Sequence, residues 1–209
     1  MILTPRFLVF LSAALILAIT PGPGIFYVLA RSLRGGRREG VLSSAGTFLG
    51  GLVHVAAAAF GLSAILAASA IAFDTVRYAG AAYLIYLGYR MIRRRHQEDV
   101  AVDSGVSSRG TFVQGVMTEV LNPKTALFFL SFIPQFVSVK QGHVAEQFLM
   151  LGAISVTLNT CADLLVACFA GPLGSRMKRS ARFRSRQRAA SGIAMIGLGA
   201  YVATGRARS

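Results

Sequence analysis

Charged residues are scarce in this sequence, and acidic residues are the scarcest of them. Charged side chains make up 14% of the 209 residues, and only 8 are Asp or Glu. Hydrophobic residues make up 54%, and the mean hydropathy is +0.59. A soluble domain would carry about 25% charged residues. The shortage excludes an ordinary soluble domain and predicts an all-α integral membrane protein.

Recognisable catalytic and metal-binding patterns are missing as well. The sequence shows no His/Asp/Glu cluster, no HExxH motif and no Ser/His/Asp set, and its polar loops are too short for a catalytic domain. We therefore expect no enzyme activity and no cofactor. A non-transport membrane protein, either a structural partner subunit or a membrane enzyme, remains the alternative to a transporter.

Cysteine is nearly absent, with Cys161 and Cys168 in one apolar stretch. Seven residues on a helix separate two side chains by about 10 Å along the axis, which is too far for a disulfide. We expect both to be small buried hydrophobic residues. A thiol–disulfide electron carrier would need a redox cysteine near each break described below, and neither broken segment contains one.

Six apolar segments are long enough, or nearly long enough, to cross a bilayer, which takes about 20 residues. They are Phe7–Ala30, Val41–Ala68, Ala70–Tyr89, Thr111–Val137, Phe148–Gly171 and Ala189–Thr204. The sequence thus predicts a single transmembrane domain, 1–209, with six transmembrane helices.

The net charge of +14 is distributed unevenly between the two sides of these segments. The loops after segments 1, 3 and 5 hold most of the basic residues: Arg31, Arg34, Arg37, Arg38, Arg90, Arg93, Arg94, Arg95, Arg109, Arg176, Lys178, Arg179, Arg182, Arg184, Arg186 and Arg188. The other side holds Arg6, Arg77, Lys140, Arg206 and Arg208. Because cytoplasmic loops are enriched in Lys and Arg, both termini are predicted outside. No RNA-binding module accompanies the basic runs, so we expect contact with lipid headgroups and no nucleic-acid binding.

The chain divides into two halves of three segments each. A polar stretch at about 97–109 is expected to be a cytoplasmic linker between repeat 1, about 1–96, and repeat 2, about 110–209. Three spans per half reverse the orientation of the second half, which predicts two inverted three-helix repeats. The segment "PGPGIFYVL" (Pro21–Leu29) aligns with "PKTALFFLS" (Pro123–Ser131), each with a proline followed by an aromatic pair.

Those two segments predict broken helices 1 and 4. Proline removes a backbone N–H and clashes with the preceding turn, and freed backbone groups are tolerated in a membrane only inside protein or beside a polar cavity. We expect a midplane substrate site there, formed by Thr20, Pro21, Gly22, Pro23, Gly24, Asn122, Pro123, Lys124 and Thr125. The helix N-termini near Gly24 and Thr125 suit a carboxylate, with Lys124 assisting, and the carbonyls before each break suit an ammonium.

Ionisable residues at membrane depth are further candidates. Asp163, Glu119 and His54 are predicted to carry charge or to couple transport to protons. Asp163 first, and Glu119 second, are predicted to meet the substrate ammonium. Asp163 continues a stripe with Ser155 and Asn159, and His54 follows Gly46 and Gly50. The alternatives stay open: His54 as a core histidine bonded to a backbone carbonyl, Lys124 with Asp163 as a structural ion pair, and Glu119 as a solvated residue near the cytoplasmic interface. Asp74 and Arg77 are expected at the outer surface without a role.

The chain resembles the LysE/RhtB superfamily of amino-acid exporters over about Pro5 to Ala203. The likeness rests on "TPGPG", "GTFLGGLVHVAAAAFGLSAILAAS", "AGAAYLIYLGYRMIR" and "EVLNPKTALFFLSFIPQFV", with a looser fit of "SGIAMIGLGAYVA". The second segment departs from relatives by having Gly51 where a polar residue is frequent.

This resemblance implies a multi-pass exporter of the bacterial inner membrane, driven by the proton motive force. Its expected partners are an amino acid or related small metabolite, protons and membrane lipid. The expected mechanism is alternating access, in which one three-helix unit moves against the other. A homo-oligomer is compatible with the sequence, which leaves the substrate and the proton stoichiometry open.

Overall fold

The computed structural model describes residues 5–93, 108–179 and 181–204, and this part of the chain is built from helices alone. In chain order the elements are α1 (Pro5–Ile19), α2 (Pro23–Ala56), η1 (Ala57–Leu62), α3 (Ser63–Ala68), α4 (Ala70–Arg93), α5 (Ser108–Val120), α6 (Pro123–Leu127), η2 (Phe128–Phe132), η3 (Ile133–Phe136), η4 (Val139–Gln141), α7 (Val144–Arg179) and α8 (Ala181–Thr204). η1 and η2 are π-helical turns, whereas η3 and η4 are 3₁₀ turns.

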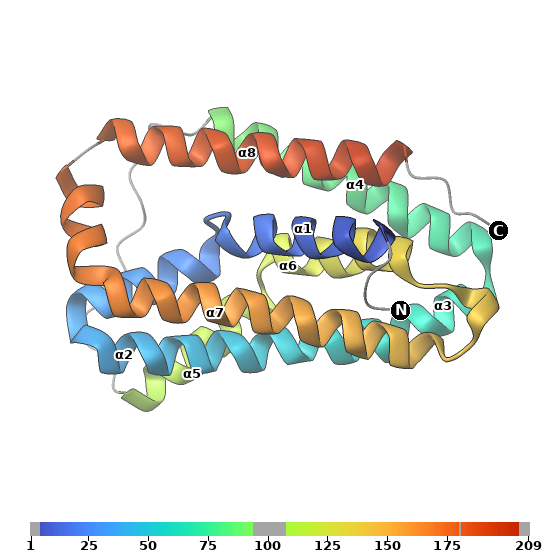
Figure 1. Ribbon diagram of the computed structural model, residues 1–209, viewed down its shortest axis with the longest axis horizontal. Coiled ribbons are helices and arrows are strands. Elements are labelled where there is room, and N and C mark those ends of the chain that lie inside the picture. Colours follow the sequence, from blue (N-terminus) through green and yellow to red (C-terminus); the bar gives the residue numbers. More distant parts are fainter. Residues whose placement is uncertain (1–4, 94–107, 180, 205–209) are drawn as a thin grey trace.

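The helices run back and forth along one axis as a bundle (Figure 1). The start of α2 continues the direction of α1, and the chain then reverses at Gly36, whose φ of 73° suits glycine. The rest of α2 packs along α5 and α7, while α4 packs along α8. Both breaks therefore lie inside the bundle, with α1 and α6 close to its centre (Figure 1).

The predicted segments correspond to these helices, but several helices are longer than predicted. α7 continues to Arg179 and α8 begins at Ala181, so the basic residues within 176–179 and 181–188 lie in helices, and the predicted loop after segment 5 is wrong. Arg and Lys are good helix formers, so a polar extension of a spanning helix is not a loop signal. The predicted linker at 97–109 falls largely outside the described residues, and α5 already begins at Ser108.

Three stretches of the described residues are long and apolar enough to cross a membrane: Pro23–Ile65, Arg109–Phe136 and Val144–Ala170. Pro5–Ile19 and Met195–Thr204 are apolar but shorter. Large apolar side chains such as Phe60, Ile71 and Phe169 face outward. The buried core gathers around Phe10, Phe128, Phe132 and Phe148, between α1, η2, η3 and α7.

Four side chains lie where the sequence did not predict them. Arg31, expected in a loop, is buried within α2, and Arg77, expected at the outer surface, is buried and donates from Nε to the Val202 carbonyl at the end of α8. Arg77 also pairs with Asp74 at 3.3 Å. Cys161 and Cys168 are free, but both are exposed, so their predicted burial is wrong. Composition alone does not tell which face of an all-apolar helix turns outward.

Close packing of α2 against α5 depends on small residues. A Cβ added at Gly46 would lie 2.3 Å from the Phe112 carbonyl oxygen, and one added at Gly50 would lie 2.7 Å from the Val116 carbonyl oxygen. Glycine lets two membrane helices approach this closely. The contact matters for the site because α5 carries Glu119 and ends at the second break.

Gly46→Ala is therefore expected to destabilise the protein by about 1–3 kcal/mol, the usual cost of overpacking. Gly61→Ala is the matched control, because nothing lies within 4 Å of a Cβ at that position. Thermal unfolding of both variants in detergent tests this. Equal melting temperatures would mean that α2 and α5 can separate without loss.

Candidate functional site

The first break exposes backbone carbonyls at the end of α1. Residues Thr20–Gly22 are not helical, and Pro23 begins α2. In a continuous helix the Leu17 carbonyl would accept from the N–H of residue 21, but that residue is Pro21, which has none. The Leu17 carbonyl accepts from the Thr20 N–H at 3.2 Å instead. Lys124 Nζ also donates to the Leu17 carbonyl, at 3.1 Å, and to the Thr20 carbonyl, at 2.9 Å.

The second break starts a new helix in the middle of the bundle. α5 ends at Val120, and Asn122 caps α6 by accepting from the Lys124 N–H with its side-chain oxygen at 3.1 Å. Pro123 follows at the first helical position, where its missing N–H costs nothing. The predicted break is thus confirmed, and the N-cap turns the Lys124 side chain toward α1.

Glu119 lies where the two breaks meet. Its side chain is buried, accepting from Thr125 Oγ1 at 2.6 Å and from Asn122 Nδ2 at 3.0 Å. A Cβ added at Gly24 would lie only 2.7 Å from Glu119 Oε2. The Glu119 carboxylate therefore lies against the first turn of α2 and of α6, at the positive ends of both helix dipoles. It is not solvated, so that alternative for Glu119 is wrong.

The Lys124 side chain therefore contacts a helix C-terminus, whereas the Glu119 side chain contacts helix N-termini. Lys124 is buried on the carbonyls that end α1, and Glu119 is buried at two helix N-termini. Within the described residues no ion pair at 4 Å or less joins Lys124 to Glu119 or to Asp163. The alternative of a direct Lys124–Asp163 ion pair is therefore wrong. The expectation that Lys124 assists the helix N-termini in binding a substrate carboxylate stays a prediction.

Asp163 is fully buried on α7, and Thr47 connects it to the small cavity described below. Thr47 Oγ1 donates to Asp163 Oδ2 at 2.8 Å, whereas Asp163 Oδ1 has no hydrogen-bond partner. The predicted stripe on α7 is real, because Ser155 and Asn159 line the same small cavity as Thr47. Asp163 lies one turn further along the helix, behind Thr47.

His54 contacts the end of α5 from α2. Its Nε2 lies 2.9 Å from the Glu119 carbonyl, which can only accept, so Nε2 carries the proton. The ring stacks on Phe129 with centroids 5.9 Å apart. These contacts match the alternative that His54 is a core histidine bonded to a backbone carbonyl. His54 does not line the small cavity described below.

A cavity at this junction is small. Its volume is about 20 Å³. Apolar residues of α1, η2 and α7 line it together with Thr47, Gly51, Glu119, Thr125, Ser155, Asn159 and Thr160. That volume is enough for roughly one water molecule, whereas small-molecule sites usually offer about 300 Å³ or more. In the described conformation this cavity therefore has no space for an amino acid.

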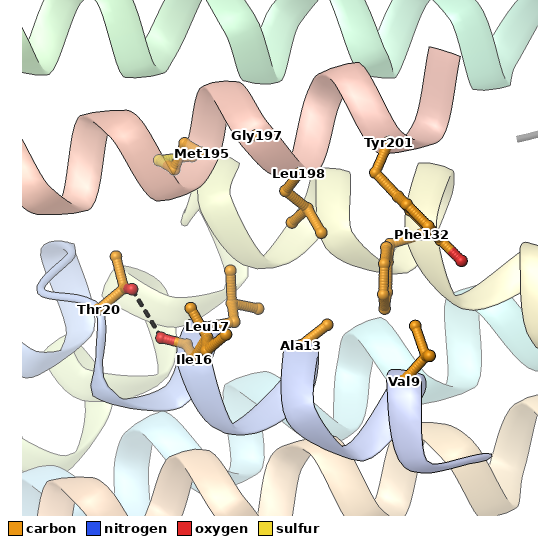
Figure 2. A pocket seen from close by; sticks show the side chains of 10 residues that line it. All are labelled: Val9, Ala13, Ile16, Leu17, Thr20, Phe132, Met195, Gly197, Leu198 and Tyr201. Atoms are coloured by element: carbon orange, nitrogen blue, oxygen red, sulfur yellow. Dashed lines mark hydrogen bonds between the residues drawn. The ribbon is translucent and has the colours of Figure 1, made fainter. Parts of the chain in front are cut away.

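A larger cavity of about 320 Å³ lies on the other side of α1. Figure 2 shows its lining of Val9, Ala13, Ile16, Leu17, Phe132, Met195, Leu198 and Tyr201, with Thr20 at one end. Thr20 Oγ1 is already bonded to the Ile16 carbonyl at 2.6 Å. The lining offers almost no polar group, so the cavity does not suit a zwitterion.

Thr47, Thr160 and Arg31 belong to the polar interior but were not among the predicted site residues. Thr47 had a weak signal, because it precedes Gly51 by one helical turn in a glycine-rich stripe. Thr160 adjoins the predicted Asn159. Arg31 was hidden because a basic residue at the end of an apolar run is typical of a cytoplasmic loop.

Comparison with known proteins gives matches along nearly the whole chain. An uncharacterized membrane protein of Pseudomonas aeruginosa is 35% identical over 188 residues, which cover 87% of this chain and 84% of the relative. A homoserine/homoserine lactone efflux protein of Salmonella typhimurium is 28% identical, covering 94% and 95%. A leucine efflux protein of Klebsiella pneumoniae is 26% identical, covering 95% of both. No solved structure matches.

The family match covers residues 15–206, including the end of α1, both breaks and the residues around them. Translocators are transport proteins rather than enzymes, which agrees with the apolar helices long enough to span a membrane. The chain is thus a multi-pass protein of the bacterial cytoplasmic membrane, and it belongs to the LysE type translocator family.

Proposed function

We propose that this protein is a secondary active exporter of amino acids or related small metabolites, that it works by proton antiport, and that its substrate binds between the breaks of helices 1 and 4. The printed names of two relatives, leucine efflux protein and homoserine/homoserine lactone efflux protein, support this substrate class. The exporter class follows from the family, whereas the antiport and the site are our proposal.

One observation carries the proposed site. The carbonyls that end α1 hold an ammonium, that of Lys124, and the N-termini at Gly24 and Thr125 adjoin a carboxylate, that of Glu119. An amino acid carries both groups. The protein's own side chains thus occupy a pair of positions that would suit the two ends of a zwitterion. Substrate binding would replace one or both of these contacts.

The arrangement of the helices supports two inverted repeats with six spans. The first broken helix, α1 with the start of α2, runs opposite to the second, α5 with α6 (Figure 1). The reversal within α2, the end of α4, the start of α5, the end of α7 and the start of α8 all lie toward the same end of the bundle (Figure 1). By sequence, these segments carry basic residues, among them Arg34, Arg38, Arg90, Arg93 and Arg109. That end would be cytoplasmic, with both termini outside.

Asp163 is the proposed proton carrier. It is buried with one carboxylate oxygen unpartnered, and Thr47 connects it to the cavity. Binding of a proton from outside would neutralise a buried charge and let the transporter return to the inward-facing state. In this scheme Glu119 stays with the helix N-termini and acts mainly on substrate binding.

Export itself is tested with purified protein in liposomes loaded with a mixture of labelled amino acids. An imposed pH gradient is expected to drive one amino acid or a small group of them out, and metabolite profiling of medium from overexpressing cells should show the same compounds. Liposomes without protein are the control. Protein-containing liposomes that release nothing, together with unchanged medium, would contradict the exporter and favour a partner subunit.

A further inference from the structure

A row of polar side chains continues from the breaks along the contact between the start of α2 and α5. Tyr27 and Arg31 lie three and seven residues after Gly24, on one face of α2. Tyr27 donates from its hydroxyl to the Thr111 carbonyl at 2.6 Å, and Arg31 Nη2 donates to Gln114 Oε1 at 2.5 Å. The row therefore runs from Glu119 at the midplane toward the end of the bundle that carries the basic residues.

Arg31 is the unusual member of this row. It is 4% exposed, and its Nε is buried without a hydrogen-bond partner. Its guanidinium lies 5.6 Å from the centre of the Tyr27 ring, and its Nη2 contacts the neutral amide of Gln114. Among the described residues no carboxylate lies within 4 Å of Arg31. A buried guanidinium normally has an anionic partner, because an uncompensated buried charge is costly.

An acidic side chain close to this row, that of Glu39, bonds to a residue other than Arg31. Glu39 Oε2 accepts from Thr111 Oγ1 at 2.5 Å, so that carboxylate lies beside Thr111. The Arg31 guanidinium is thus held between the Tyr27 ring and the Gln114 amide, and its Nε–H donor has no hydrogen-bond partner. The fork of donors on a guanidinium matches the two oxygens of a carboxylate.

We propose that Arg31 is a second carboxylate-binding residue, which takes the carboxylate of an amino acid arriving from the cytoplasmic side before that amino acid reaches the breaks. Gln114 bonds to the guanidinium while no substrate is present. Gly24 and Arg31 are about 10 Å apart along α2, so the carboxylate would pass from one positive group to the next. The inference rests on the proposed function.

The test measures efflux from right-side-out membrane vesicles preloaded with leucine or homoserine, whichever the wild type carries faster, and with the corresponding amide. Arg31→Gln is expected to raise the KM for the internal amino acid about 10- to 100-fold, as for a lost charge-assisted hydrogen bond. The KM for the amide, which has no carboxylate, should change little, and kcat should stay within about threefold. Arg34→Gln, an exposed arginine of the same helix, is the matched control.

Gln114→Glu gives an independent test that keeps Arg31 and is expected to fold, because it supplies the missing carboxylate. This variant should raise the KM for the amino acid by a similar factor, since the new side chain competes for the guanidinium. Equal changes for amino acid and amide in Arg31→Gln, or an unchanged KM in Gln114→Glu, would overturn the role of Arg31. A wild type without flux of either compound would overturn the proposed function too, so the two failures are distinguishable.

Discussion

Replacement of Pro21 and Pro23 together by alanine is expected to abolish export. Alanine at these positions restores two backbone N–H groups, and α1 and α2 can then join as one helix. The new N–H of residue 21 would donate to the Leu17 carbonyl, and the N–H of Gly24 would donate to the Thr20 carbonyl. These are the two acceptors of Lys124. The ammonium would be left buried without a partner, and the substrate would lose the same acceptors.

The expected loss is about 100-fold or more in the export rate, because charge-assisted hydrogen bonds contribute roughly 1.5–3 kcal/mol each. The single change Pro21→Ala restores only the bond to the Leu17 carbonyl, so an intermediate loss is expected. Pro5→Ala, at the exposed start of α1, is the control and should export normally. Efflux from liposomes is the measurement, with thermal unfolding as a check that each variant is folded.

A double variant that exports at the wild-type rate would show that the break in helix 1 is not part of the transport site. A double variant that unfolds at a much lower temperature would be judged by Pro21→Ala instead. If Pro21→Ala then exported normally, the Leu17 carbonyl would be excluded as a substrate contact, and the proposed site would be reduced to the Thr20 carbonyl and the helix N-termini.

The sequence predicted the two breaks well because proline acts locally. Pro21 and Pro123 remove an N–H and fix φ whatever surrounds them, so α1 ends at Ile19 and α6 begins at Pro123 as the pattern requires. The cap on α6 was also readable in principle, since Asn before Pro is a favoured N-cap combination. Such local signals do not depend on how distant segments pack, so they can be read from the sequence.

The direction of long side chains was less predictable. The sequence placed Lys124 beside the helix N-termini, but the side chain reaches back to the carbonyls of α1, more than 100 residues earlier in the chain. Glu119 instead lies against Gly24, Asn122 and Thr125. Lys124 and Glu119 are close in sequence, but the way in which α1 and α2 pack against α5 and α6 decides which helix end each side chain contacts. Sequence spacing does not determine this packing.

Burial of Arg31 was missed for a related reason. The positive-inside pattern is a statistical property of loops, and it carries no information on whether one basic residue turns inward. Tyr27 and Gln114 enclose Arg31 only because the start of α2 packs against α5. Beyond Gly36, the rest of α2 also packs closely on α5, where a Cβ added at Gly46 would lie 3.0 Å from Gly115 Cα.

Asp163→Asn is expected to abolish export driven by a pH gradient while leaving amino-acid exchange in place. Asparagine has nearly the same size and can still accept the hydrogen bond from Thr47 Oγ1, but it cannot take up and release a proton. Net export should therefore fall to the rate measured without a gradient. Exchange of labelled for unlabelled amino acid across the liposome membrane needs no net proton movement, so it should continue.

Two further acids make this prediction decisive. Asp74→Asn, in the ion pair with Arg77, lies outside the proposed site and should retain pH-driven export. Glu119→Gln should lose both export and exchange, because Glu119 bonds to Asn122 and Thr125 at the helix N-termini. If Glu119→Gln kept exchange but lost the response to pH, and Asp163→Asn kept both, proton coupling would belong to Glu119. The two carboxylates can be separated in this way because one lies at the helix ends and the other behind Thr47.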